Sequence, residues 1–309
     1  MAGGFDISDH ASVLVLLATY NGARFLREQL GSLAAQKGVR VAILWRDDGS
    51  VDHTRELVVT QCAALDLDLR IIGDEIGATG SAGANFMAIA RAAIDAPFDY
   101  FAFCDQDDIW LPDKLSKSIA MLREGDAAAY SSNLTAFSDR TAREWIVRKS
   151  GAQGPFDYLF QGASAGCTYV LTPEALRHCV DLLPGGRFPK WLSHDWYVYA
   201  ACRAAGMAWV MDDESRIRYR QHDDNAFGAK PGLRGLIDRL SFMRSGWYRN
   251  HIAWLSKVIP LDDKALAITA AVERLNMRDR LYLLWSASHS RRRFQDRLLL
   301  RLTIIFNLL

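Results

Sequence analysis

The first half of the chain alternates short apolar runs with stretches in which apolar residues recur every three or four positions. Within 23–36, for example, Phe25, Leu26, Leu30 and Leu33 follow a helical period. Strands are expected at 13–18, 39–45, 69–72 and 100–104, and helices at 23–36, 52–65, 85–94 and after Pro112. This order predicts an α/β protein with a mostly parallel sheet that is covered by helices on both faces.

The second half follows a looser pattern. Strands are expected at 127–137, 166–171, 209–211 and 217–220, and helices at 173–182 and 195–205. From residue 231 onward the pattern contains no strand and predicts two or three amphipathic helices, of which the last covers 294–309. We therefore expect a domain over 1–230, with halves at about 12–125 and 126–230, and a helical extension over 231–309.

Charge divides the chain at the same place. Residues 1–230 carry 23 Lys and Arg against 30 Asp and Glu, whereas residues 231–309 carry 14 against 6. The net charge of +1 hides this difference between an acidic body and a basic tail. No nucleic-acid-binding motif accompanies the basic residues, so no nucleic-acid partner is expected.

The five cysteines are widely spaced and include no pair in a Cys-x-x-Cys pattern. Neither a disulfide framework nor a zinc site is expected, and a reducing cytoplasm is the simplest location. The sequence begins without a secretory signal pattern and contains no apolar run of about 18 residues. We therefore expect a cytoplasmic protein that does not span a membrane.

Acidic residues cluster where strands end. Asp47 and Asp48 follow the second strand, and Asp105, Asp107 and Asp108 follow the strand at 100–104. In a parallel sheet these ends meet at the edge that binds ligands. Crowded carboxylates repel one another unless a cation or donor groups compensate, and their hard oxygens suit Mg²⁺ or Mn²⁺. The alternative interpretation for the second cluster is a solvated acidic turn that caps the helix at Pro112, with Asp108 as a candidate for the cap.

Six motifs occur in order along the chain. They are Ala18-Thr19-Tyr20-Asn21-Gly22, Asp47-Asp48-Gly49-Ser50, the run from Asp105 to Leu115, Gly166-Cys167-Thr168, His194-Asp195-Trp196, and Tyr219-Arg220-Gln221-His222-Asp223-Asp224-Asn225. Together they resemble family 2 glycosyltransferases, which have the Rossmann-like GT-A fold. The match covers roughly residues 12–230, and its acidic and histidine motifs look most like the rhamnosyltransferase-like branch found in bacteria.

The resemblance implies a nucleotide-binding set at the first half of the sheet. Thr19 and Tyr20 would lie beside the base and ribose, Asp105 would bind the ribose, and Asn85 would line the nucleotide cleft. Asp48 would accept a hydrogen bond from the N3–H group of uracil or thymine, since a carboxylate offers only acceptors. The expected donor is therefore a UDP-sugar or a dTDP-sugar.

The resemblance also implies metal and catalytic groups. Asp107 would bind Mn²⁺ or Mg²⁺, and His222 would be a second ligand or, alternatively, a hydrogen-bonded loop residue. Asp195 would be the catalytic base of an inverting transferase, although it could also act as the N-cap of the helix that follows. Trp191 and Trp196 flank this base and are candidates for an acceptor platform, with packing in the core as the alternative.

The expected reaction is transfer of a sugar to a hydroxyl of a bacterial surface glycan, with dTDP-rhamnose as the leading donor. A UDP-hexose-dependent transferase, a sugar nucleotidyltransferase and a non-catalytic glycan-binding protein are the alternatives. Acceptors in the family are often lipid-linked. The basic C-terminal helices are expected either to contact the cytoplasmic face of the inner membrane or to pack on the catalytic domain or a second subunit.

Overall fold

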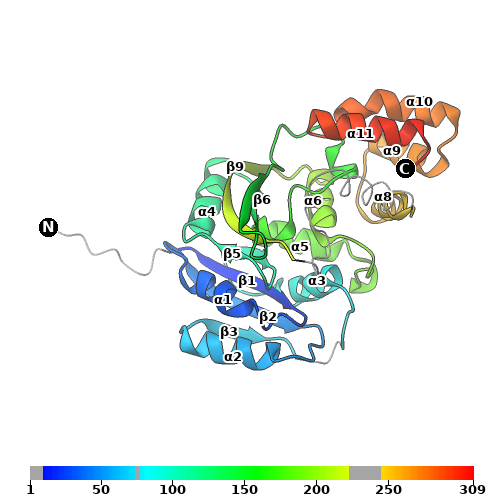
Figure 1. Cartoon of the computed structure of the whole chain (residues 1–309). Coiled ribbons are helices and arrows are strands. Elements are labelled where there is room, and N and C mark those ends of the chain that lie inside the picture. The colour runs from blue at the N-terminus through cyan, green and yellow to red at the C-terminus, as the bar shows by residue number, and fades with distance from the viewer. Residues whose placement is uncertain (1–9, 74–76, 223–244) are drawn as a thin grey trace.

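The computed structural model describes residues 10–73, 77–222 and 245–309 (Figure 1). Its strands are β1 (Ser12–Thr19), β2 (Arg40–Asp47), β3 (Asp68–Ile71), β4 (Tyr100–Cys104), β5 (Ile109–Trp110), β6 (Ala129–Ser138), β7 (Arg143–Val147), β8 (Val170–Leu171) and β9 (Trp209–Arg220). Its α-helices are α1 (Leu26–Ala34), α2 (Thr54–Ala64), α3 (Ala82–Ala93), α4 (Lys114–Glu124), α5 (Pro173–Asp181), α6 (His194–Ala204), α8 (Trp247–Val258), α9 (Asp263–Arg274), α10 (Met277–Ser286) and α11 (Phe294–Ile305). Short 3₁₀ turns lie at η3 (Asp157–Leu159), η4 (Gly166–Thr168), η5 (Pro184–Gly186) and η6 (Ala287–His289).

These strands form one sheet in the order β3-β2-β1-β4-β8-β6-β9-β5, with β7 paired to β6. The first four strands in this order are parallel, which confirms the expected arrangement for the N-terminal half. The expected mostly parallel sheet extends into the other half through the parallel pair β6 and β9. Among the described residues, antiparallel strands occur in this half only, where β8 runs antiparallel to both β4 and β6, β5 to β9, and β7 to β6. The carboxyl ends of β1, β2 and β4 meet at one edge, where the acidic turns follow.

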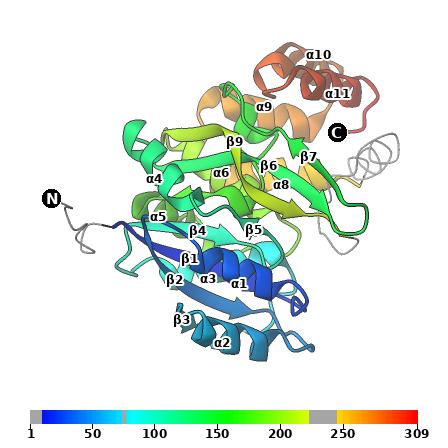
Figure 2. The same ribbon diagram turned by 60° about the vertical axis from the view of Figure 1, so that its left-hand side comes forward.

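The sheet is covered on both faces, as the alternation along β1 shows. Val13, Val15 and Leu17 pack with α1, α2 and α4, while Leu14 and Leu16 pack with α3, α5 and α6. Successive side chains of a strand point to opposite faces of the sheet. All of these side chains are at most 1 % exposed, because helices cover both faces. Figure 2 shows the two helical layers around the sheet.

Two segments differ from the expected pattern. The stretch 166–171 forms the turn η4 and the two-residue strand β8 instead of one strand. The strands expected at 209–211 and 217–220 are a single strand, β9, that pairs with β6 across register shifts. Its polar centre does not interrupt it, because Asp212 accepts a hydrogen bond of 2.8 Å from the Tyr130 hydroxyl in the interior.

The C-terminal helices α8 to α11 pack on the face of the sheet that α3, α5 and α6 cover. Ile252, Ile268, Leu283 and Leu300 are at most 1 % exposed and belong to the same hydrophobic core as β1. Residues 245–309 contain helices and turns only, as expected, but four α-helices instead of two or three. The helical period expected over 233–243 and the start of the extension at 231 lie outside the described residues, so the domain division at 230 stays a prediction.

A buried ion pair joins the segment that precedes α11 to the turn η3. Asp157 is fully buried and lies 2.7 Å from Arg292, whose side chain is 3 % exposed. Arg203 and the Tyr199 hydroxyl also bind this carboxylate, at 3.2 and 2.8 Å. Because a charge without partners is costly in the interior, this carboxylate determines where Arg292, and with it the chain leading to α11, can lie.

Removing Arg292 should therefore destabilise the protein. Arg292→Ala leaves Asp157 with fewer countercharges, and loss of one partner of a buried pair typically costs about 3 kcal/mol. Chemical denaturation should show this loss in the free energy of unfolding. Arg293→Ala, which changes the exposed neighbouring arginine, is the matched control and should change stability by less than roughly 0.5 kcal/mol. Equal effects of the two substitutions would contradict the proposed role of the pair.

Candidate active site

The end of β2 is shaped by hydrogen bonds to Asp47. Its carboxylate accepts from the Thr19 hydroxyl at 2.8 Å, from the Ser50 amide at 2.8 Å and from Arg55 at 3.0 Å. Burial alone would raise the pKa of Asp47, but these hydrogen bonds hold it below its ordinary value. Thr19 is 2 % exposed, and its hydroxyl donates to Asp47 and accepts from Trp45. Only backbone atoms of Thr19 could therefore contact a nucleotide.

Asp48 organises the glycine-rich loop that precedes α3. One of its oxygens accepts from the Thr79 amide at 2.6 Å, and the other accepts from the Gly80 amide at 2.8 Å. Arg46 lies 3.0 Å from the same carboxylate and donates to the side-chain oxygen of Asn85 at 2.6 Å. Asn85 is 2 % exposed and supports Arg46 from below the loop. The base-reading role of Asp48 stays a prediction, since each carboxylate oxygen can accept a further bond.

Gln106 joins the first strand end to the acidic turn. Its amide group accepts from the backbone N–H of Tyr20 at 2.8 Å and donates to the Tyr20 carbonyl at 3.0 Å. Gly22 makes room for it, because a Cβ atom at this position would lie 2.2 Å from the Gln106 side-chain oxygen. Tyr20 itself is 58 % exposed and stands beside this junction, at the position expected to meet the nucleotide.

The acidic turn after β4 lies beside the first turn of α6. Burial and the nearby negative charges of Asp107 and Asp195 raise the pKa of Asp105 to about 7. Three carboxylates from two distant segments are therefore close enough to repel one another. The structure brings the predicted ribose ligand, metal ligand and base together at the sheet edge where the sequence places them.

Asp107 and His222 are direct neighbours. Nε2 of His222 lies 2.8 Å from a carboxylate oxygen of Asp107, and the imidazole stacks on Phe25 with ring centroids 4.7 Å apart. Arg220 donates to the Asp107 carbonyl at 3.0 Å and so holds the turn against the end of β9. A carboxylate and an imidazole side by side, within a group of carboxylates that repel one another, fit a divalent cation such as Mn²⁺ or Mg²⁺.

Asp108 is buried beneath this turn and does not cap the following helix, which begins at Lys114. It is 1 % exposed, accepts from the Arg220 amide at 3.2 Å, and is hydrogen-bonded to the Cys167 thiol. Atoms of Asp105, Asp108 and Cys167 lie within 4.8 Å of one another. Burial raises the pKa of both Asp108 and the Cys167 thiol well above their ordinary values, and the negative charges of Asp107 and Asp105 add to the effect on Asp108.

Asp195 lies in the first turn of α6. Its carboxylate accepts from the Trp196 amide at 2.7 Å and from the Ser193 hydroxyl, and its carbonyl accepts from Tyr169 at 3.1 Å. The alternative that Asp195 is the N-cap of this helix is wrong, because Ser193 occupies that position. The positive end of the helix dipole lies at this turn.

The start of α6 is held against β4 by His194. Its ring stacks on Phe86 at 4.4 Å between centroids and meets Phe103 edge-on at 5.3 Å. A Cβ atom on Gly166 would lie 2.3 Å from Nε2 of His194, so only glycine fits at this position. This contact explains the glycine of the Gly166-Cys167-Thr168 motif and places Asp195 next to the acidic turn.

The two candidate acceptor tryptophans have different environments. Trp196 is 4 % exposed, stacks on His251 at 4.0 Å and donates to the Tyr158 carbonyl at 2.8 Å. The prediction of an acceptor platform is wrong for Trp196, because its ring is packed in the core. Trp191 is 43 % exposed, and its role stays a prediction.

Sequence reasoning missed the roles of Arg46, Arg220 and Gln106. Arg46 carries the one detectable signal, since it interrupts the otherwise apolar run of β2 just before Asp47. The contacts of Arg220 and Gln106 join segments far apart in sequence and leave no local pattern. Asp223, Asp224 and Asn225 of the last motif lie outside the described residues.

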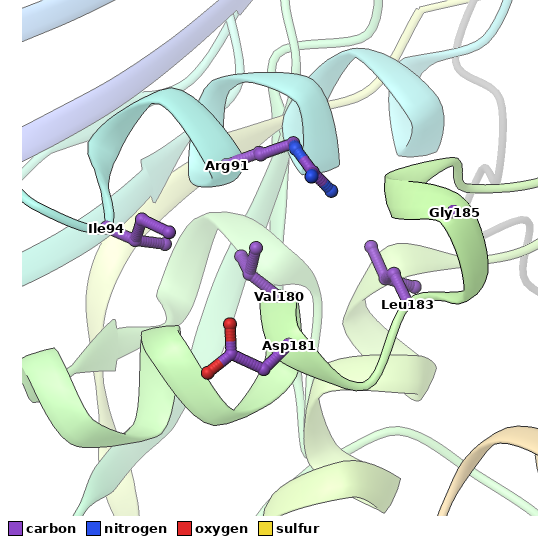
Figure 3. Close-up of a pocket in the computed structure, with 6 residues that line it drawn as sticks. All are labelled: Arg91, Ile94, Val180, Asp181, Leu183 and Gly185. Carbon is purple, nitrogen blue, oxygen red and sulfur yellow. The ribbon is translucent and has the colours of Figure 1, made fainter.

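Two cavities lie away from this cluster. One of about 300 Å³ is lined by Arg91, Ile94, Val180, Asp181, Leu183 and Gly185, between α3 and α5 (Figure 3). Another of about 200 Å³ lies at the ends of β2 and β3 and includes Asp47 and Arg55 in its wall. No predicted catalytic or metal-binding residue lines either cavity.

Comparisons with known proteins agree with the motifs. Residues 14–172 match the model of Glycosyl transferase family 2. A dTDP-rhamnosyl transferase, RfbG of Shigella flexneri, is 33 % identical over 251 residues, which cover 80 % of this chain and 85 % of the relative. The Escherichia coli glucosyltransferase WfgD, described as acting from UDP-Glc on α-D-GlcNAc-diphosphoundecaprenol, is 26 % identical over 54 % of this chain and 62 % of its own length.

Solved structures show the same fold. S. aureus TarS in complex with UDP-GlcNAc aligns with a TM-score of 0.59 at 15 % identity, over 96 % of this chain and 80 % of that one. The mannosyltransferase PcManGT of Pyrobaculum calidifontis, in complex with GDP-Man and Mn²⁺, aligns with a TM-score of 0.51 at 16 % identity, over 98 % and 89 % of the two chains.

The stacked pair of Trp196 and His251 should make stability depend on pH. Burial lowers the pKa of His251 to about 3, whereas the unfolded ring titrates near 6.5. Between these values the unfolded state binds one proton more than the folded state, so stability falls as the pH falls, by about 1.4 kcal/mol per pH unit. His251→Phe keeps a ring for stacking and should remove this slope between about pH 4 and 6 in denaturation experiments.

The control is His53→Phe, because His53 is 87 % exposed. That substitution should leave the pH dependence of the unfolding free energy unchanged. An unaltered slope in His251→Phe would show that His251 does not stay neutral in the folded protein.

Proposed function

Because the chain belongs to glycosyltransferase family 2, we propose that it is an inverting, metal-dependent enzyme that transfers a sugar from a nucleoside diphosphate to a hydroxyl of a bacterial surface glycan. The fold is the GT-A type expected from the motifs. The observation that carries the proposal is the meeting of Asp105, Asp107, His222 and Asp195 at one edge of the sheet. Family membership argues against a sugar nucleotidyltransferase or a non-catalytic glycan-binding protein.

The leading donor is dTDP-rhamnose. The printed activity of the 33 % identical relative supports this choice, whereas the more distant WfgD supports a UDP-hexose as the alternative. The base of either nucleotide sugar carries an N3–H group that can donate a hydrogen bond to Asp48. The carboxylate of Asp48 would therefore favour uracil and thymine over bases with acceptors at that edge. Calorimetry with dTDP, UDP, GDP and CDP distinguishes these donors, and tightest binding of GDP would contradict the role of Asp48.

Asp195 would act as the general base. It would take the proton from the acceptor hydroxyl as that oxygen attacks the anomeric carbon, while the nucleoside diphosphate leaves from the opposite face. Its hydrogen bonds from Ser193 and the Trp196 amide hold the carboxylate in one orientation. The exposed ring of Trp191 lies on the loop before this residue and is the remaining candidate for contact with the acceptor.

Asp107 and His222 would hold the cation, and Asp105 would bind the ribose. When bound, Mn²⁺ or Mg²⁺ would neutralise negative charge on the diphosphate group. Burial and the negative charges of Asp107 and Asp195 raise the pKa of Asp105, and a nearby cation would offset the part that the charges contribute.

We also propose that the enzyme acts in the cytoplasm, in peripheral contact with the inner membrane, on an acceptor that is lipid-linked. The described part of the chain holds no helix long and apolar enough to cross a bilayer. All five cysteines are buried free thiols, and even Cys179 and Cys202, with sulfur atoms 3.7 Å apart, are not bonded to each other. Free thiols are typical of a reducing compartment and support the cytoplasmic assignment.

Nucleotide binding should depend on the metal and on Asp107. Asp107→Ala removes a carboxylate ligand, so titration calorimetry should show that Mn²⁺ no longer increases the affinity for dTDP or UDP. Asp181→Ala, at an exposed position of α5, is the matched control and should keep the metal effect. Metal-dependent binding that survives in Asp107→Ala would show that the turn does not hold the cation.

Asp195 should separate binding from transfer. Asp195→Asn keeps the size of the side chain but cannot take a proton, so transfer should fall by about a hundred- to ten-thousand-fold while donor affinity stays near normal. Glu174→Gln, in the equivalent first turn of α5, is the control and should keep full activity. Wild-type turnover in Asp195→Asn would place the base elsewhere.

A further inference from the structure

Eight large apolar side chains lie exposed on the last two helices. On α10, Met277, Leu281 and Trp285 are 69 %, 62 % and 70 % exposed, and their four-residue spacing places them on one face. The corresponding residues of α11 are 41 to 75 % exposed and are Phe294, Leu298, Leu302, Ile305 and Phe306. We refer to these eight residues as the apolar face of the α10–α11 hairpin.

The two helices lie antiparallel and expose the same side of the hairpin. Arg280, near the start of α10, donates to the carbonyls of Ile304 and Ile305 at the end of α11, at 3.0 and 2.6 Å. Leu283 of α10 and Leu300 of α11 are each 1 % exposed and point into the common core. The apolar face therefore points away from the body, at the end of the molecule opposite β3 and α2 (Figure 1).

The surroundings of this face are strongly basic. Residues 277–309 contain seven arginines and two aspartates. Asp279 is paired with Arg274 at 2.8 Å, so it does not neutralise the surface of the hairpin. Arg278, Arg293 and Arg301 are exposed, and no carboxylate of the described residues lies within ion-pair distance of them.

We propose that the α10–α11 hairpin docks on an anionic phospholipid surface, with its apolar face in the lipid and Arg278, Arg293 and Arg301 at the headgroups. Exposed apolar residues flanked by arginine are typical of helices that lie in a bilayer interface, and Trp285 has the amphipathic ring favoured at that depth. A second copy would fit less well, because a two-fold contact sets the same basic surface against itself. This proposal identifies the residues that would make the peripheral membrane contact proposed above, and it does not depend on the transfer chemistry.

Contacts within the protein connect this surface to the proposed base. Arg292, between the two helices, donates to the carbonyls of Gly162 and Ala163 at 2.7 and 2.8 Å. The Ala163 amide donates to the Tyr169 hydroxyl at 3.0 Å, and that hydroxyl donates to the Asp195 carbonyl. A docked hairpin would therefore hold the catalytic cluster at a defined orientation to the lipid surface.

Vesicle flotation tests the proposal with the full-length protein. We expect binding to vesicles of phosphatidylglycerol and phosphatidylcholine, little binding to phosphatidylcholine alone, and release at high salt, because attraction to anionic lipid is screened by salt. Arg278→Gln with Arg301→Gln should weaken binding roughly five-fold per arginine at low salt. The charge-matched control is Lys37→Gln with Lys117→Gln, which changes two exposed lysines, one after α1 and one in α4. This control should have little effect.

The apolar contribution has its own variant. Leu281→Ser with Leu298→Ser should lower binding by roughly ten-fold or more, since each side chain leaves the lipid. Val59→Ser with Ile146→Ser changes two similarly exposed residues, at 45 % and 51 %, outside the hairpin and is the matched control. Nucleotide affinity measured in solution should stay constant in all four variants, which shows that they fold and tests the transferase assignment separately.

Three outcomes would overturn the proposal. The first is wild-type protein that does not float with anionic vesicles at low salt. The second is equal loss of binding in the hairpin variants and their controls. The third is a dimer in analytical ultracentrifugation that the Leu281→Ser and Leu298→Ser pair dissociates while vesicle binding stays unchanged, since the apolar face would then bind a second copy.

Discussion

The carboxylates of Asp107 and Asp195 are held close to that of Asp105 although like charges repel, and burial together with this repulsion raises the pKa of Asp105 to about 7. Such crowding is unfavourable in the free protein and becomes favourable when a cation or a ligand with donor groups enters. Two distant segments have to be fixed to maintain it, namely the turn after β4 and the first turn of α6. Much of the surrounding structure serves to hold these two turns in place.

Buried arginines provide much of that support. The Arg220 guanidinium donates to the Asp107 carbonyl and forms ion pairs with Glu28 and Asp139, and the Arg220 amide donates to the Asp108 carboxylate. Arg220 therefore joins the acidic turn to α1 and to the end of β6. Arg46 does the same for Asp48 and the loop before α3. Each guanidinium offers several donors in a plane, which allows one side chain to satisfy a carboxylate and backbone carbonyls together.

The C-terminal helices combine an internal and an external role in one basic segment. Arg292 points inward to Asp157, while the neighbouring Arg293 is exposed. A basic run is therefore a poor guide to a binding surface unless the partner of each side chain is known. The apolar residues of α10 and α11 divide in the same way, with Leu283 and Leu300 in the core and Leu281 and Leu298 on the surface.

The sequence by itself determined the parallel half of the sheet, the order of its strands and helices, and the positions of Asp48, Asp107 and Asp195 at strand and helix ends. These features depend on local periodicity and on short motifs, which one segment can carry alone. Only the tertiary structure decided that Trp196 is a core residue, that Ser193 and not Asp195 caps α6, and that β9 is one strand with a polar centre. It also decided which arginines are internal and which face solvent. Burial and partnership depend on segments more than a hundred residues apart, as for Arg220 with Asp107 and Arg292 with Asp157, and no local pattern records such contacts.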